Sequence, residues 1–86
     1  MTIDIKQKRL NKEKLNKAII TYEDVNNHAP YLFMNIDTMK DLDVSLEHTD
    51  ETLYDRDVYR ATYWSQYGLC RVFDLEILPY GEVELR

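Results

Sequence analysis

The stretch YLFMN, residues 31–35, decides the fold that this sequence predicts. It is a short apolar run between Pro30 and Asp37, and runs of this length flanked by turn-forming residues are typical of buried strands. Pro30 also restricts the residue before it to extended geometry. We therefore expect residues 31–35 to form a central strand around which the other elements are arranged.

A helix is predicted on each side of this strand. After Asn11, which can cap a helix start, apolar side chains recur at intervals of three and four residues and so share one stripe. The stripe consists of Leu15, Ala18, Ile19, Tyr22 and Val25. Asn26, Asn27 and Pro30 end this helix. Beyond the strand, Asp37 is a candidate cap for a short helix that runs to about Leu42.

The acidic middle of the chain predicts less regular structure. Residues 44–48 alternate between apolar and polar types, which indicates a short edge strand or a loop. Residues 47–57 are polar and acidic, and we expect them to form a surface loop. Residues 59–66 alternate again and predict a strand.

The C-terminal third predicts a strand, a turn and a final strand. Apolar and polar residues alternate along residues 69–77. One face of this predicted strand carries the apolar residues Leu69, Phe73, Leu75 and Ile77 and is interrupted by Arg71. Residues 78–81, LPYG, predict a β-turn with Pro in second and Gly in fourth position. Residues 82–85, EVEL, predict the last strand.

The order α-β-α-β-β-β predicts an α+β domain with a small antiparallel or mixed sheet of about four strands and two helices packed on one face. The 86 residues are expected to form a single domain, 1–86, in which residues 1–10 are a flexible lead-in or an extension of the first helix. A domain this small cannot leave a whole sheet face bare, so the stripe on residues 15–25 is expected to cover one face.

Cysteine and apolar content indicate the compartment. Cys70 is the only cysteine, so the chain has no intramolecular disulfide, which fits a reducing cytoplasm. No apolar run reaches the ~18–20 residues that span a bilayer. The N-terminal residues lack the apolar stretch of a signal peptide. We predict a cytoplasmic protein that does not bind membranes.

Signatures of catalysis and cofactor binding are missing from the sequence. Two glycines are too few for a Gly-rich phosphate loop, and His28 and His48 lack metal-ligand spacing. Cys70 with either histidine could form a thiol–imidazole pair, but a lone cysteine in a predicted strand is usually a small buried hydrophobe. A domain of this size should also have little room for a ligand cleft of ~300 Å³. We predict no enzyme activity, no catalytic residues, no cofactor and no metal.

Charge is distributed unevenly along the chain. Residues 1–17 carry a net charge of +4 and the other residues −9, which together give −5. A domain with so acidic a remainder should repel free nucleic acid and suit a protein partner with a basic surface. Self-association of the basic end with the acidic stretch, giving a homo-oligomer, is a further possibility.

Carboxylates interleaved with aromatic residues form the predicted partner-binding site. Its members are Asp41, Asp43, Glu47, Asp50, Glu51, Tyr54, Asp55, Asp57, Trp64 and Tyr67. Surface carboxylates can imitate phosphate charges in a basic nucleic-acid groove, and aromatic rings can anchor the contact. Two alternatives stay open: the acids only keep the surface soluble, and Trp64 only fills a strand face.

Two segments of the chain resemble tailed-phage proteins. Residues 30–42, PYLFMNIDTMKDL, have a strand ending in Met-Asn followed by a short helix that opens at Asp-Thr. Residues 67–85, YGLCRVFDLEILPYGEVEL, have Gly, an apolar strand with an acidic residue, a Pro-x-Gly turn and a last strand. This pair of segments resembles segments in the peripheral domain of phage capsid subunits and in small phage and prophage proteins. The chain is much shorter than a capsid subunit, so the resemblance implies a phage-encoded accessory protein.

From these observations we predict a non-catalytic phage accessory protein that binds a protein partner in the host cytoplasm. In its narrower form it is an acidic inhibitor, a nucleic-acid mimic, of a host nucleic-acid-binding or anti-phage defence protein. A virion structural or assembly component is the alternative, and a small enzyme is the second alternative.

Overall fold

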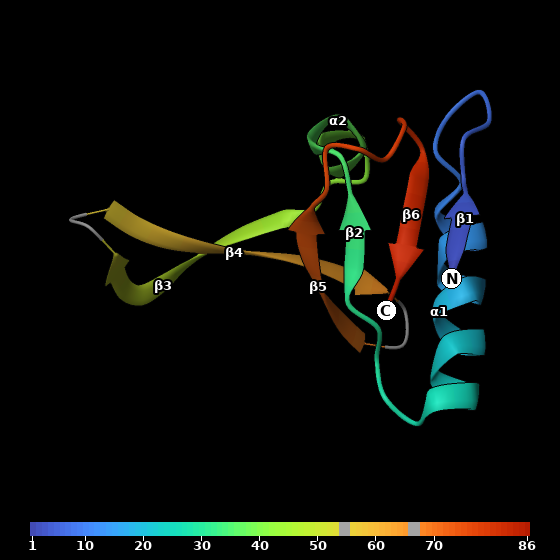
Figure 1. Ribbon diagram of the computed structural model, residues 1–86, viewed down its shortest axis with the longest axis horizontal. Coiled ribbons are helices and arrows are strands. Elements are labelled where there is room, and N and C mark those ends of the chain that lie inside the picture. The colour runs from blue at the N-terminus through green and yellow to red at the C-terminus, as the bar shows by residue number, and fades with distance from the viewer. Residues whose placement is uncertain (54–55, 66–67) are drawn as a thin grey trace.

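The computed structural model describes the backbone of residues 1–53, 56–65 and 68–86, and the side chains of residues 1–46, 61–65 and 68–86. The elements are β1 (Thr2–Asp4), α1 (Lys12–Asn26), β2 (Leu32–Met34), α2 (Ile36–Asp41), β3 (Ser45–Leu53), β4 (Arg56–Ser65), β5 (Gly68–Asp74) and β6 (Glu82–Leu85). The chain is α+β, as predicted. Its described strands form one mixed sheet of six strands, two more than expected (Figure 1).

The predicted central strand is β2. The strand order is β1-β6-β2-β5-β4-β3, with β2 parallel to β5 and antiparallel to β6. The other neighbouring pairs are antiparallel. Leu32 is the register partner of both Val72 and Leu85, so this short strand joins the two halves of the sheet.

The first residues of the chain form an edge strand, so the prediction of a loose lead-in or helix extension over residues 1–10 was wrong. β1 pairs with β6, and the Leu85 N–H donates to the Met1 carbonyl (2.7 Å). Ile5 is fully buried, and its N–H donates to the Gly81 carbonyl (2.8 Å). Three residues are too few to show a strand period, so pairing with β6 makes the strand.

The acidic stretch is also more regular than predicted. Residues 47–53 belong to β3 and residues 56–57 to β4, where a loop was expected, and the β3–β4 register shifts between His48 and Thr52. Carboxylates have low intrinsic strand propensity, and here pairing with β4 overrides it. β5 pairs only with Ala61–Ser65 of β4, so the outer part of the hairpin extends away from the rest of the sheet (Figure 1).

One face of the sheet is buried in the core. Alternate side chains of the strands pack in one apolar cluster with Leu15 and Ile19 of α1. The strand members are Leu32, Met34, Tyr63, Cys70, Val72, Val83 and Leu85. The predicted α1 stripe is therefore correct at its centre. Val25 is 75% exposed, so the buried stripe does not reach the last turn of α1.

Asparagine side chains cap both helices. Asn11 accepts a hydrogen bond from the Lys14 N–H (3.1 Å), as predicted for α1. The cap of α2 is Asn35, whose side chain accepts from the Thr38 N–H (2.8 Å), so the choice of Asp37 was wrong. Asn35 has the extended backbone that a cap requires, while Asp37 already lies inside the first turn.

Thr38 ties α2 to the connection between β5 and β6. Its buried Oγ1 donates to Asn35 Oδ1 (2.8 Å) and accepts from the Gly81 N–H (3.0 Å). Gly81 has φ of 86°, and a Cβ there would lie 2.6 Å from Lys6 Cβ, so the position requires glycine. The hydrogen-bonded turn joins Pro79 to Glu82, one residue later than predicted. Packing of both helices on one face stays a prediction.

Two buried threonines provide a matched test of this fold. Thr62 Oγ1 is buried without a hydrogen-bond partner in the described part of the chain, whereas Thr38 Oγ1 has two. We expect Thr62→Val to raise the free energy of unfolding by about 1 kcal/mol, because an unpartnered buried hydroxyl costs ~1–3 kcal/mol. Thr38→Val should lower it by about 1–3 kcal/mol by leaving the Gly81 N–H unpaired. Urea unfolding followed by circular dichroism measures both, and shifts in the same direction would contradict this account.

Candidate functional site

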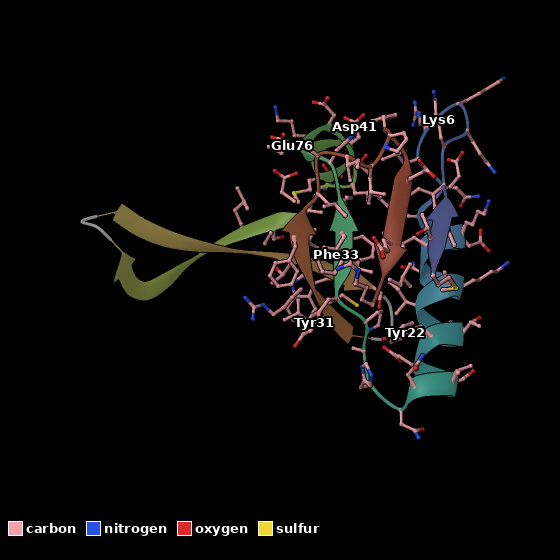
Figure 2. All side chains as sticks on the ribbon, in the orientation of Figure 1. Lys6, Tyr22, Tyr31, Phe33, Asp41 and Glu76 are labelled. Carbon is pink, nitrogen blue, oxygen red and sulfur yellow. The ribbon has the colours of Figure 1, made fainter. Side chains whose placement is uncertain are left out.

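The sheet face opposite the core carries aromatic and charged side chains. We define the open face by eight residues that alternate along the strands with buried residues, or that lie beside such residues in the strand register. They are Tyr31, Phe33, Trp64, Leu69, Arg71, Phe73, Glu84 and Arg86. Tyr31 is 52% exposed, Phe73 36% and Trp64 64%. Figure 2 labels Tyr31 and Phe33 beside β2, while Tyr22 lies on the α1 side.

Three rings form the centre of the open face. Phe33 and Phe73 are register partners on β2 and β5, and their rings stack with centroids 5.3 Å apart and planes 22° apart. Tyr31 meets Phe73 edge to face at 5.7 Å. Both arrangements are those that the ring quadrupoles favour. The rings therefore make a pre-arranged apolar surface.

Two guanidinium groups lie against these rings. Arg86 Cζ is 4.4 Å from the Phe33 centroid and Arg71 Cζ is 5.3 Å from the Phe73 centroid, within the range of cation–π attraction. Two hydrogen bonds to Glu84 hold Arg86, Nε to Oε1 at 2.8 Å and Nη2 to Oε2 at 3.1 Å. The same pairing lowers the pKa of Glu84 and raises the pKa of Arg86, so both stay charged near neutral pH. Together these groups can take part in recognition by apolar burial and cation–π contact.

The predicted acidic site is not assembled as one patch. Asp41 accepts a hydrogen bond from the Tyr80 hydroxyl, which raises the pKa of Tyr80, and Asp43 pairs with Lys12 Nζ at 3.3 Å. Both carboxylates lie at the end of α2. Trp64 pairs with Leu69 at the start of β5, whereas α2 follows β2 beside Asp74 at the other end of β5. The register thus separates Trp64 from Asp41 and Asp43.

Four of the other predicted contact residues belong to the β3–β4 hairpin. Glu47, Asp50, Glu51 and Asp57 belong to its strands, and their side chains lie outside the described part of the structure. Tyr54, Asp55 and Tyr67 lie outside the described residues altogether.

Sequence reasoning missed the open face because it assigned β5 the wrong apolar side. Leu69 and Phe73 belong to the predicted apolar face of residues 69–77, but Cys70 and Val72 are the buried residues. The signal was Arg71: a charged residue in the same row as Leu69 and Phe73 indicates that this row meets solvent. The unbroken apolar run YLFMN likewise supplies both faces of a strand.

An apolar groove adjoins the open face, between α2 and strands β3 to β5, and Arg71 and Phe73 of the open face contribute to its lining. It encloses about 460 Å³, and its apolar lining includes Ile36, Met39, Val44, Leu46 and Ala61. The expectation that a chain of this size has little room for a ligand cleft was therefore wrong. The short α2 leaves part of the sheet uncovered, which makes the groove possible.

Cys70 is held in a form that is a poor nucleophile at neutral pH. The side chain is buried, and burial, with a smaller contribution from Glu23, raises the pKa of the thiol from 9.0 to about 11. His28 lies beside the Ala29 carbonyl (Nδ1 to O, 3.1 Å) and the Tyr22 ring, 5.4 Å between centroids. The described geometry places Cys70 in the core as a small apolar side chain.

Two other kinds of site are absent from the described residues. No helix there is long and apolar enough to cross a bilayer. No group of three or more His, Cys, Asp or Glu side chains in that part of the chain is arranged to hold a metal ion.

Comparisons with protein-family models, curated proteins and solved structures give no match for this chain. The resemblance of residues 30–42 and 67–85 to tailed-phage proteins therefore stays a prediction.

The raised pKa of Cys70 predicts a specific pH dependence of stability. The unfolded thiol ionises near pH 9 and the folded thiol near pH 11, so the stabilising difference is fully present below pH 9 and is lost as the pH rises toward 11. Tyr63, whose pKa burial also raises, adds a loss of the same sign. We expect Cys70→Ala to weaken the decline in the urea midpoint between pH 8.5 and 11. Equal declines in wild type and Cys70→Ala would contradict the prediction.

Proposed function

We propose that this protein is a non-catalytic binding protein that docks a protein partner on its open face. The observation that supports the proposal is the ring cluster of Tyr31, Phe33 and Phe73. Arg71 and Arg86 lie against these rings, and the exposed Trp64 lies farther along the same face. Contiguous exposed apolar patches are typical of interaction sites, and Trp, Tyr and Arg are the residues most enriched at binding hot spots.

The arrangement of these side chains favours binding for an energetic reason. Association costs ~4–15 kcal/mol in lost freedom, so several anchors must act together. Burying one large apolar side chain contributes about 1.5–3 kcal/mol. The ring stacking and the Glu84–Arg86 pair already fix part of the surface before binding, which lowers the cost of ordering it.

A second proposal concerns the β3–β4 hairpin and retains the acidic inhibitor. Its support is that Glu47, Asp50, Glu51 and Asp57 lie on a hairpin that extends from the sheet (Figure 1). Carboxylates along such a ribbon could occupy the basic groove of a nucleic-acid-binding host protein. This proposal includes a phage source and a location in the host cytoplasm. The single thiol supports the location, because it suits a reducing compartment. A virion component remains the alternative.

Affinity capture with matched variants tests the proposed function. Wild type, Phe73→Ser and Ile77→Ser are immobilised and exposed to lysate of the source cells. Ile77 is 83% exposed outside the open face, so its variant removes a similar apolar surface at a different place. We expect one protein to be retained by wild type and Ile77→Ser, and roughly tenfold less by Phe73→Ser, as for loss of a hot-spot side chain.

Salt separates the two proposals. Retention through the open face should change little between low and physiological salt, whereas retention through the hairpin carboxylates should fall steeply. Circular dichroism of each variant confirms that it is folded. Equal retention by folded Phe73→Ser and wild type at both salt concentrations would refute docking on the open face.

A further inference from the structure

We infer that the apolar groove beside α2 binds a small amphipathic anion, a ligand with an apolar body and one carboxylate. This inference goes beyond the proposed function and does not depend on it. The groove encloses about 460 Å³, which lies within the ~300–1,000 Å³ of most small-molecule sites. Residues of α2, of the connection from α2 to β3 and of strands β3 to β5 line it.

Three register partners form the floor of the groove. Ala61 pairs with Leu46 on one side and with Val72 on the other, so the three residues lie in one row across β3, β4 and β5. Cross-strand partners point to the same face of a sheet. Val72 is buried and Leu46 is 70% exposed, so the row runs from the core out to solvent. Its smallest side chain, Ala61, lies in the middle, which leaves space above the sheet for a ligand.

One side of α2 forms the wall of the groove. Ile36, Met39 and Lys40 are spaced at i, i+3 and i+4, so they share one side of the helix, and all three line the groove. The two carboxylates of the helix, Asp37 and Asp41, do not belong to this lining. The buried threonine of α2 is hydrogen-bonded to the connection between β5 and β6, which fixes the helix in place. The wall is therefore formed before a ligand arrives, which lowers the cost of binding.

The charged groups of the lining favour a negative ligand. They are two cations, Lys40 and Arg71, and one carboxylate, Asp74, a net charge of +1 in a chain of net charge −5. Within the described part of the chain, neither cation has an ion pair or a hydrogen bond from its side chain. Cationic donors that are not yet engaged form strong hydrogen bonds with a carboxylate.

Arg86 provides the contrast to Arg71. Both guanidinium groups lie against a phenylalanine ring, but the donors of Arg86 are engaged by Glu84, with two hydrogen bonds of 2.8 and 3.1 Å. Arg71 also lines the groove, and Arg86 does not. Of the two arginines, Arg71 is therefore the one that is able to hold a ligand carboxylate at the groove.

A peptide segment is the competing occupant. Its backbone N–H and C=O groups need hydrogen-bond partners when they are buried. In the described lining only Lys40, Arg71 and Asp74 have polar side chains, and the other members are apolar. An apolar body without backbone groups fits such a lining better than a peptide does.

Octanoate, octanol and octylammonium test the inference, because they have the same tail and differ in charge. Each is titrated into the isotope-labelled full chain, and amide chemical shifts give both the Kd and the location. We expect octanoate to shift the amides of Val44, Leu46 and Ala61 and to bind roughly tenfold more tightly than octanol, with octylammonium weaker than both. Hexanoate should bind more weakly than octanoate, by up to about fourfold for each methylene lost.

Matched variants separate the contribution of the tail from that of the charge. Ala61→Leu fills the middle of the floor and should weaken octanoate binding at least roughly tenfold. Arg71→Gln and Lys40→Gln should each weaken octanoate binding roughly threefold and leave octanol binding unchanged. Arg86→Gln should leave both unchanged. Circular dichroism confirms that each variant is folded, and the two charge variants test the inference if Ala61→Leu does not fold.

Four results would overturn the inference. They are the absence of saturable shifts with octanoate, shifts centred outside the groove, octanol or octylammonium binding as tightly as octanoate, and unchanged octanoate binding in folded Ala61→Leu. The capture experiment separates this failure from that of the proposed function. If octanoate does not bind and Ala61→Leu loses the captured protein, the groove belongs to a protein interface and only the small ligand is refuted. If octanoate binds as expected and capture is equal for Phe73→Ser and wild type, only docking on the open face is refuted.

Discussion

The placement of β2 between β5 and β6 is the constraint on which the rest of the structure depends. Only three residues form this strand, yet Leu32 is the register partner of Val72 on one side and Leu85 on the other. The β2–β5 pair is parallel, so the chain between these strands has to cross from one end of the sheet to the other. α2 and the β3–β4 hairpin make that crossing. Pairing of β4 with β5 then places the acidic hairpin at one edge of the sheet, and pairing of β1 with β6 places β1 at the other.

The period of two along the strands then decides which side chains reach solvent. Burial of Leu32 and Met34 with Val72 places Phe33 and Phe73 on the opposite face, since neighbouring residues of a strand point to opposite sides. A shift of one residue in β5 would bury Phe73 and expose Val72. The surface proposed for binding is therefore a direct consequence of how the core is packed, and not a separate addition to it.

Features with a strong local signal could be predicted from the sequence. The central strand follows from an apolar run next to a proline, the α1 cap from Asn11, and β6 from the clean alternation of EVEL. β1 and the outer hairpin could not be predicted, because three residues show no period and a carboxylate-rich stretch resembles a loop. The open face was missed for another reason: both rows of β5 contain apolar residues, and the prediction treats Arg71 as an interruption of the apolar row, although Arg71 marks the row that meets solvent.

The strongly acidic hairpin and the nearly balanced open face can have different roles in the same molecule. β3 is an edge strand, and exposed edges tend to pair with strands of other chains. Two copies that paired along β3 would bring Glu47, Asp50 and Glu51 of each copy close to the same residues of the other, and like charges at that distance repel. The acidic composition of β3 thus disfavours association of two copies through this edge. Net charge alone suggests a basic partner, but the carboxylates are distributed unevenly over the sheet, so the charge of each surface differs from the charge of the chain.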